Sequence, residues 1–243
     1  MWEAESALAG LVAWLGDQVR QAGREGVVFG MSGGLDSAVV AGLCRRCFAD
    51  RARGLFLDCE SDPADLADAE AAAEAVGLPL LRLDLTQVYR GLLQAAFGPD
   101  AWALPRVVTA NVKSRLRMVT LYAWANKLNY LVVGTGNLDE LTVGYFTKYG
   151  DSGVDLLPLG ALTKGRVREL GRALGLPARV LDKPPSAGLW PGQTDERELG
   201  LSYETIDRYL LGAEVEPEAA ARIERLRQAS GHKRAMPPIA PLA

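Results

Sequence analysis

The residues best suited to chemistry form a glycine-rich turn near the start of the chain, Ser32-Gly33-Gly34-Leu35-Asp36-Ser37. A turn of this kind in front of a helix offers backbone N–H groups and hydroxyls to a bound phosphate. Its two glycines lack the Cβ atoms that would keep the backbone away from such a ligand. Asp36 would repel a phosphate, unless its carboxylate holds a divalent cation that the phosphates also bind. The turn therefore predicts a site for a phosphate and a cation.

This turn differs from the two common nucleotide-binding loops. It lacks the lysine of the pattern Gly-x-x-x-x-Gly-Lys-Ser/Thr, and it does not follow the pattern Gly-x-Gly-x-x-Gly. The alternative interpretation is an ordinary strand-to-helix turn in which Asp36 only begins the helix.

The turn lies within an alternation of apolar strands and helices. Strands are predicted at 27–29, 54–57, 80–85 and 130–133, and loops at 98–106 and 182–194. Helices are predicted at 3–22, 37–49, 64–76, 86–97, 108–127, 163–174, 203–211 and 217–229. This order implies a doubly wound parallel sheet with helices on both faces, a Rossmann-like α/β fold. We predict one domain over 1–243, in which the segment after 140 supplies a cap and loops rather than a second core.

Composition narrows the class of protein. The chain has 243 residues, 49% of them hydrophobic, and a net charge of -3, so neither a basic nucleic-acid surface nor a membrane span is expected. Three cysteines make no disulfide framework, and we expect a soluble protein of the reducing cytoplasm. Cys44 and Cys47 match a redox pair or half of a zinc site, but we interpret them as ordinary helix residues.

Ser-Gly-Gly-x-Asp-Ser after a first strand resembles the ATP pyrophosphatase superfamily, whose members cleave ATP between the α and β phosphates. Later segments resemble successive motifs of the ammonia-dependent NAD synthetases, at 111–118, 134–140, 144–151, 183–187, 193–196 and 232–234. They run in family order from about residue 27 to 234, and the resemblance implies an adenine nucleotide alpha-hydrolase-like fold. Residues 58–62 match no motif of the family, so the adenine contacts stay unassigned.

The resemblance implies a ligase that forms a C–N bond. The carboxylate of deamido-NAD attacks the α-phosphate of ATP, pyrophosphate leaves, and ammonia converts the acyl adenylate to NAD and AMP. The chain is too short to add a glutaminase domain, so free ammonia is expected unless a separate glutaminase subunit docks. The resemblance also implies a homodimer, and the helix at 108–127 has apolar residues on more than one side.

Individual roles follow from the same resemblance. The ATP site would comprise Gly30, Met31, Ser32, Gly33, Gly34, Leu35, Asp36, Ser37, Thr135, Lys164 and Ser186. The deamido-NAD site would comprise Arg115, Lys148, Asp155, His232 and Lys233. Mg²⁺ would be bound by Asp36 and Glu140, which follow two adjacent strands.

Three of these residues are candidates for catalysis. Asp36 would act through the metal, Lys164 would neutralise phosphate charge, and Asp151 would take a proton from ammonium. The alternatives are a solvated carboxylate at Glu140, a surface lysine at 164 and a turn-binding aspartate at 151. We also expect the loop at 182–194 to be mobile without ligand and to close over the acyl adenylate.

Two other functions fit part of the pattern. A sulfur-transfer enzyme of the same superfamily would need a catalytic cysteine, and Cys59 at the end of the second strand is the candidate. A nucleotide-binding sensor without turnover would not need both Asp36 and Glu140, so their joint presence favours metal-assisted chemistry.

Overall fold

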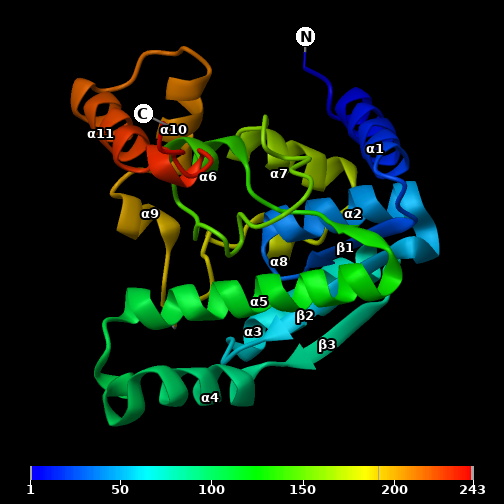
Figure 1. Ribbon diagram of the computed structural model, residues 1–243. Helices are drawn as coiled ribbons and strands as arrows, with labels where there is room; N and C mark the ends of the chain where they lie inside the picture. Colours follow the sequence, from blue (N-terminus) through cyan, green and yellow to red (C-terminus); the bar gives the residue numbers. More distant parts are fainter. Residues whose placement is uncertain (1, 191, 242–243) are drawn as a thin grey trace.

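A computed structural model describes residues 2–190 and 192–241. Its centre is a sheet of four parallel strands in the order β3-β2-β1-β4 (Figure 1). The strands are β1 (Gly26–Gly30), β2 (Ala52–Asp58), β3 (Leu80–Asp84) and β4 (Tyr130–Val132). Val28 of β1 is in register with Arg53 on one side and Val132 on the other. Because β1 is central, its side chains are buried on both faces of the sheet, and four of its five residues are fully covered.

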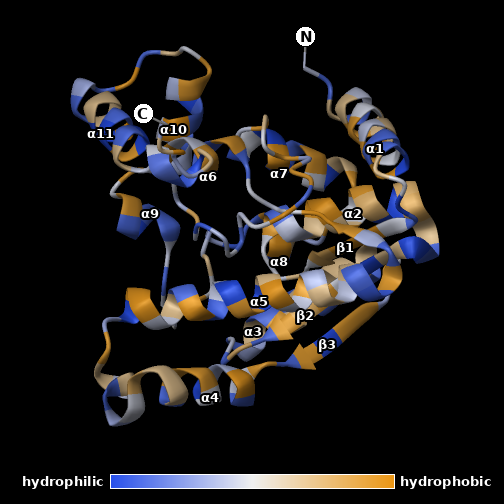
Figure 2. Ribbon diagram, viewed as in Figure 1, coloured by the Kyte–Doolittle hydropathy of each residue, from blue (hydrophilic) through white to orange (hydrophobic). Residues whose placement is uncertain are grey.

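Helices cover both faces of this sheet. On one face lie α2 (Leu35–Phe48) and α3 (Pro63–Ala75), with α1 (Ala4–Gln21) and α7 (Lys164–Ala173) packed against α2. The other face is covered by α5 (Arg106–Leu128), and α4 (Thr86–Phe97) packs against α5. Each face has its own hydrophobic cluster. In Figure 2, β2 is largely orange and the outlying helix α11 (Pro217–Ala229) largely blue, as expected for a core strand and a peripheral helix.

The strand order reverses beside β1. The chain runs from β1 to β2 and β3 through helices on one face, and then returns through α4 and α5 on the other face to β4. The connections that leave β1 and β4 therefore diverge, and a crevice opens at the carboxyl ends of these two strands. The doubly wound parallel fold is confirmed, and so is the adjacency of the first and fourth strands.

The predicted strands and long helices match the observed elements to within a few residues. Sequence periodicity did not predict three short helices, α6 (Leu138–Val143), α8 (Ala178–Leu181) and α9 (Asp195–Leu199). Each spans fewer than two turns, too short for an apolar repeat to develop. The predicted loop at 98–106 includes a 3-10 helix, η2 (Gly98–Ala103), and two more flank β2 and the tail, η1 (Ala49–Arg51) and η3 (Gly231–Lys233).

The segment after residue 140 differs from the expectation of a cap without a core. Side chains from α6, α9, α10 (Tyr203–Leu210), α11 and the connection between α9 and α10 form a small hydrophobic cluster of their own, Val143, Leu199, Leu201, Ile206 and Ile223. The physical reason is that these short helices are amphipathic and turn their apolar faces toward one another. Because α7 from the same segment packs in the main core, the two clusters are tied together.

The cysteines are all free, and Cys44 and Cys47 lie within α2, as predicted for helix residues. No helix in the described ranges is both long enough and apolar enough to cross a membrane.

We expect the chain to unfold as one domain. Ile206→Ala removes a fully buried side chain of the C-terminal cluster and should cost about 2–5 kcal/mol. If both clusters belong to one cooperative unit, calorimetry will show a single transition displaced to lower temperature. Leu211→Ala, at a side chain that is 56% exposed just after the same helix, is the matched control. A separate early transition for Ile206→Ala would show that the C-terminal helices unfold on their own.

Candidate active site

A cleft of about 430 Å³ opens at the crevice between β1 and β4. Its walls come from the glycine-rich turn, the end of β2, one side of α5 and the loop at 182–194. The predicted site residues that line it are Gly30, Met31, Ser32, Gly34, Leu35, Asp36, Ser37, Thr135, Glu140, Asp151, Lys164, Ser186 and Lys233. Most of the predicted ATP site therefore converges on one cavity.

The glycine-rich turn is held open by its own hydroxyls. The N–H of Ser32 donates to Oγ of Ser37 at 3.1 Å, and the Ser37 hydroxyl donates to the carbonyl of Gly34 at 2.9 Å. Gly33 has a φ of +79°, and a Cβ there would lie 2.2 Å from the carbonyl oxygen of Asp65, so a side chain does not fit. Gly33 thus allows the turn to pack directly against the backbone at Asp65. The first N–H groups of α2 remain without intrahelical partners and face the cleft end of the helix.

Three charged side chains, a buried lysine and two largely buried carboxylates, meet in the cleft. The ammonium of Lys164 forms an ion pair with Oδ2 of Asp36 and lies 3.8 Å from Oε1 of Glu140. Asn137, which is fully buried, donates from Nδ2 to Oδ1 of Asp36 at 3.1 Å. Its side-chain carbonyl also accepts the N–H of Glu140, whose carboxylate accepts the N–H of Asn137 in return. This reciprocal cap fixes both carboxylates, and a solvated Glu140 or a surface Lys164 does not describe the structure.

The charges shift one another's ionisation. Burial, and then the negative charge of Asp36, raise the pKa of Glu140 to about 8. Burial alone would lower the pKa of Lys164, but Asp36 and Glu140 outweigh it and the pKa is raised. When Glu140 is ionised, two carboxylates around one ammonium leave an excess of negative charge in a largely buried site, which favours a further cation.

The donor set fits Mg²⁺ that shares its ligands with a substrate. No group of three or more His, Cys, Asp or Glu side chains in the described part of the chain could hold a metal ion. Mg²⁺ is commonly bound by one or two carboxylates, with substrate phosphates and waters as its other ligands. Asp36 and Glu140 beside the glycine-rich turn match that pattern.

Two residues around Lys164 received no role from the sequence. The Lys164 ammonium lies 4.9 Å from the centroid of the Tyr203 ring, and the Tyr203 hydroxyl donates to Oδ2 of Asp195 at 3.0 Å. Burial raises the pKa of Tyr203, so this hydroxyl keeps its proton. Asp195 falls within the motif at 193–196 and could have been found there, whereas Tyr203 sits in a predicted helix without any local signal.

Asp151 lies at the rim of the cleft with one carboxylate oxygen held in place. Its Oδ1 accepts the Ser114 hydroxyl at 2.8 Å and the N–H of Thr147 at 2.9 Å. None of the described residues donates a hydrogen bond to its Oδ2. Asp151 therefore does bind its own turn, as the alternative proposed, and also presents an oxygen to the cleft.

The predicted deamido-NAD residues divide into separate places. Arg115 donates to the carbonyl of Lys148 at 3.2 Å, and the Lys148 ammonium donates to the carbonyl of His232 at 2.5 Å. These three form an outer basic group beyond the cleft lining, whereas Lys233 lines the cleft. Asp155 lies apart from them, accepting the Tyr122 hydroxyl at 3.0 Å and the N–H of Val132 at 2.8 Å. The structure therefore does not bring the five residues together in one contact set.

The segment at 58–62 shows where Cys59 points. The Cys59 side chain is fully buried against α4, beside Tyr89 and Leu93, and burial raises the pKa of its thiol to about 11. A buried, protonated thiol is a poor nucleophile, so the structure contradicts the idea that Cys59 faces the site. Ser61 does line the cleft, and it accepts a hydrogen bond from Arg117 at 3.2 Å. Arg117 belongs to the motif at 111–118, but sequence analysis assigns it no role.

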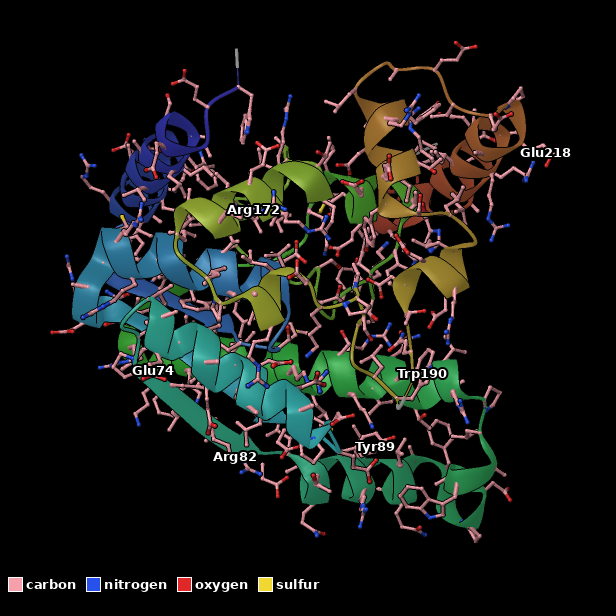
Figure 3. The ribbon with its side chains drawn as sticks, turned by 180° about the vertical axis from the view of Figure 1, so that it is seen from behind. Glu74, Arg82, Tyr89, Arg172, Trp190 and Glu218 are labelled. Carbon is pink, nitrogen blue, oxygen red and sulfur yellow. The ribbon has the colours of Figure 1, made fainter. Side chains whose placement is uncertain are left out.

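The loop at 182–194 lies across one side of the cleft; residue 191 is outside the described residues. Lys183 anchors its start through ion pairs of 2.7 Å with both Asp65 and Asp68 on α3. Further along, the buried Lys113 ammonium lies 3.4 Å from the carbonyl oxygen of Leu189. Figure 3 shows Trp190 on this loop beside α5. The loop thus contacts two sides of the cleft, and its mobility stays a prediction.

Known proteins resemble this chain along nearly its whole length. The family model described as NAD synthase matches residues 7–237. A relative from Carboxydothermus hydrogenoformans, an NH(3)-dependent NAD(+) synthetase, is 45% identical over 238 residues, which are 98% of this chain and 97% of the relative.

Two solved structures extend the likeness to the fold. The NMN synthetase from Francisella tularensis has a TM-score of 0.94 at 37% identity and covers 100% of both chains. The NH3-dependent NAD synthetase from Campylobacter jejuni has a TM-score of 0.81 at 27% identity, covering 99% of this chain and 100% of its own. The match over residues 7–237 and the relative that is 45% identical over nearly the whole chain show that this chain belongs to the NAD synthase family.

Proposed function

We propose that this chain amidates deamido-NAD with ammonia at the expense of ATP, releasing NAD, AMP and pyrophosphate. The observation that carries the proposal is the buried cluster of Asp36, Glu140 and Lys164 beside the glycine-rich turn. A protein that only senses ATP has no need to hold two carboxylates and an ammonium at the phosphates. Family membership supplies the reaction class.

The first step joins the acceptor to AMP. The nicotinate carboxylate oxygen attacks the α-phosphorus, a new O–P bond forms, and the bond to the β-phosphate oxygen breaks. Asp36 and Glu140 hold Mg²⁺, which draws charge from the phosphate oxygens when bound. Lys164 binds an oxygen of the phosphate chain, and the N–H groups of the turn at 32–37 bind the departing pyrophosphate. The other ATP contacts are Thr135 and Ser186, which line the same cleft.

The second step forms the amide. Ammonium must lose a proton before its nitrogen has a lone pair. Asp151 would take that proton on Oδ2, which accepts no hydrogen bond from the described residues. The nitrogen attacks the acyl carbon, and the C–O bond to AMP breaks. Because water would hydrolyse the acyl adenylate, the loop at 182–194 closes over the cleft and excludes it. The outer basic group (Arg115, Lys148 and His232), with Lys233 and Asp155, binds the distal part of deamido-NAD.

A second acceptor is supported by one observation. The structure with a TM-score of 0.94 over both whole chains is titled an NMN synthetase, which points to a mononucleotide acceptor for the same chemistry. The two acceptors share the nicotinate carboxylate and differ in the AMP half. They would therefore share the cleft and differ at the outer basic group.

We expect purified protein with ATP, Mg²⁺, ammonium and deamido-NAD to form NAD and AMP in equal amounts, because each amide costs one α–β cleavage. Product chromatography measures both. Lys164→Ala should lower kcat/KM on the order of 10²- to 10³-fold, since it removes a charge at the phosphates. Nicotinate mononucleotide in place of deamido-NAD decides between the two acceptors. AMP without either amide product would contradict the proposed acceptors, and no AMP despite ATP binding would contradict the enzyme.

The affinity of the protein for Mg²⁺ in the presence of ATP should change with pH below about 8. The folded protein holds a proton on Glu140 that the unfolded chain releases at its ordinary pKa. That proton's contribution to stability is present at acid pH and is lost as pH rises through about 8. Mg²⁺ competes with it, so Mg²⁺ affinity in the presence of ATP should fall about tenfold per pH unit below 8 and level off above.

Titration of activity against Mg²⁺ at several pH values measures this effect. Glu140→Gln should weaken Mg²⁺ binding at every pH and abolish the change of Mg²⁺ affinity with pH. Glu204→Gln, at an exposed glutamate on α10, should match the parent protein. A parent protein whose Mg²⁺ requirement is flat from acid to alkaline pH would contradict the assignment of Glu140.

We further propose that the chain forms a homodimer through α4, η2 and the outer side of α5. Large hydrophobic side chains stay exposed there, Val88, Leu92, Phe97, Trp102 and Val119. A patch of this kind on a monomer is unusual and marks an interaction surface. The prediction that α5 has two apolar sides agrees with this placement, since Leu121 faces the sheet while Val119 is 57% exposed.

Val119→Asp should convert the dimer to monomer, because it places a charge within an apolar interface. Sedimentation velocity measures the mass of both proteins. Met236→Asp, at an exposed position of the C-terminal tail, is the control and should stay dimeric. A parent protein that sediments as a monomer at all concentrations would refute the dimer.

A further inference from the structure

The start of α7 has no cap from its own N-terminal side chain. Lys164 is the first residue of α7, and the residue before it, Thr163, makes no capping hydrogen bond with its side chain. The Thr163 hydroxyl oxygen is instead buried without a hydrogen-bond partner in the described part of the chain. By contrast, Ser202 caps α10 and Asn137 caps α6 with their own side chains. The start of α7 therefore depends on groups from elsewhere.

Those groups are two carboxylates from separate helices. Oδ2 of Asp139 on α6 accepts the N–H of Lys164 at 2.9 Å, and Oδ2 of Asp207 on α10 accepts the N–H of Gly165 at 2.8 Å. A Cβ at Gly165 would lie 2.6 Å from that Asp207 oxygen, so a side chain there would have to push the carboxylate aside. Carboxylates at a helix start bind its free N–H groups and its positive end.

The same two helices also hold the side chain of Lys164. Glu140 follows Asp139 in α6 and lies 3.8 Å from the Lys164 ammonium. Tyr203, one turn before Asp207 in α10, places its ring centroid 4.9 Å from that ammonium. Each helix thus binds the backbone at the start of α7 with one residue and the Lys164 side chain with another.

This arrangement costs free energy. Asp139 is fully buried, and so are the second carboxyl oxygens of Asp139 and Asp207. Burial, and then a hydrogen bond with Asp207, raise the pKa of Asp139 to about 9, so Asp139 keeps its proton and can donate it to Asp207. Burying two carboxyl groups side by side is costly, and a threonine already stands at the position where a hydroxyl would cap the helix at less cost. The fold retains the expensive cap, which ties the position of α7 to α6 and α10.

We propose that Asp139 and Asp207 are positioning residues that hold the first turn of α7, so that the Lys164 ammonium meets Asp36 and the phosphates. The inference rests on the proposed function. It assigns both carboxylates a role through hydrogen bonds to backbone N–H groups, without contact to substrate. A displacement of the helix start by about 1 Å would lower the rate of phosphoryl chemistry strongly.

Gly165→Ala tests the contact without changing either carboxylate. Its Cβ must displace the Asp207 oxygen, so we expect kcat for NAD formation to fall on the order of 10- to 100-fold. A merely structural role predicts no such fall, because alanine favours a helix over glycine. Gly10→Ala, within α1 where a Cβ meets nothing within 4 Å, is the matched control and should keep the parent rate. A Gly165→Ala protein with the parent kcat would overturn the proposal.

A double-mutant cycle with Lys164 separates positioning from stability. If Asp207 acts through Lys164, Asp207→Ala should lower kcat/KM on the order of tenfold or more in the parent and by little in Lys164→Ala. Asp207→Asn retains an oxygen for the Gly165 N–H and should restore most of the activity. Equal losses in both backgrounds, or equal losses for the Asn and Ala variants, would refute the role.

Calorimetric titration with ATP and Mg²⁺ gives a readout that needs no acceptor. Weaker ATP binding by Gly165→Ala, beside unchanged binding by Gly10→Ala, is the expected result. If the parent protein binds ATP but forms no NAD, the proposed function fails, while this comparison still tests whether Asp139 and Asp207 hold the start of α7. If all the proteins bind ATP equally, these two residues do not position Lys164 and the inference fails.

Discussion

The ion cluster of Lys164, Asp36 and Glu140 is the interaction on which the rest of the site depends. Charges removed from water are costly unless they are paired and hydrogen-bonded, and all three side chains are largely buried. Removing one member would leave an uncompensated charge. Asn137 and Tyr203 add hydrogen bonding and a ring face around the cluster. Such a group persists only where the backbone on every side is fixed.

The doubly wound sheet supplies that fixed backbone. Asp36 is the second residue of α2 after β1, and Glu140 lies in α6 after β4, so two neighbouring strands deliver the carboxylates. Lys164 lies on a third element, α7, which packs in the main core through Val167 and Leu170. The C-terminal cluster then holds α6 and α10 against α7. The small second core thus positions the site, which explains why a cap without a core would not suffice.

The sequence predicted the parts of this site that depend on local chemistry. Strand-turn-helix periodicity and paired glycines identify the phosphate turn from residues 27–37 alone, because phosphate binding there uses adjacent backbone groups. Resemblance, rather than periodicity, paired Asp36 with Glu140 across 104 positions of the chain. The roles of Tyr203 and Asp207 could not be read in this way, because they depend on how α10 packs against α7. Cys59 is the opposite case, a candidate from the sequence that does not face the site. Its place at the end of a strand does not determine which way its side chain points.

The cluster also explains how a site for triphosphate can exist before its ligand arrives. With Glu140 ionised, two carboxylates and one ammonium leave one negative charge, which would repel phosphate. Asp36 and Glu140 would hold a divalent cation that reverses that sign, and Lys164 would then no longer need Asp36 as its partner. Its ammonium can then turn to a phosphate oxygen, provided that its backbone stays in place. The carboxylates that hold α7 are therefore needed most when the ion pair between Lys164 and Asp36 is released.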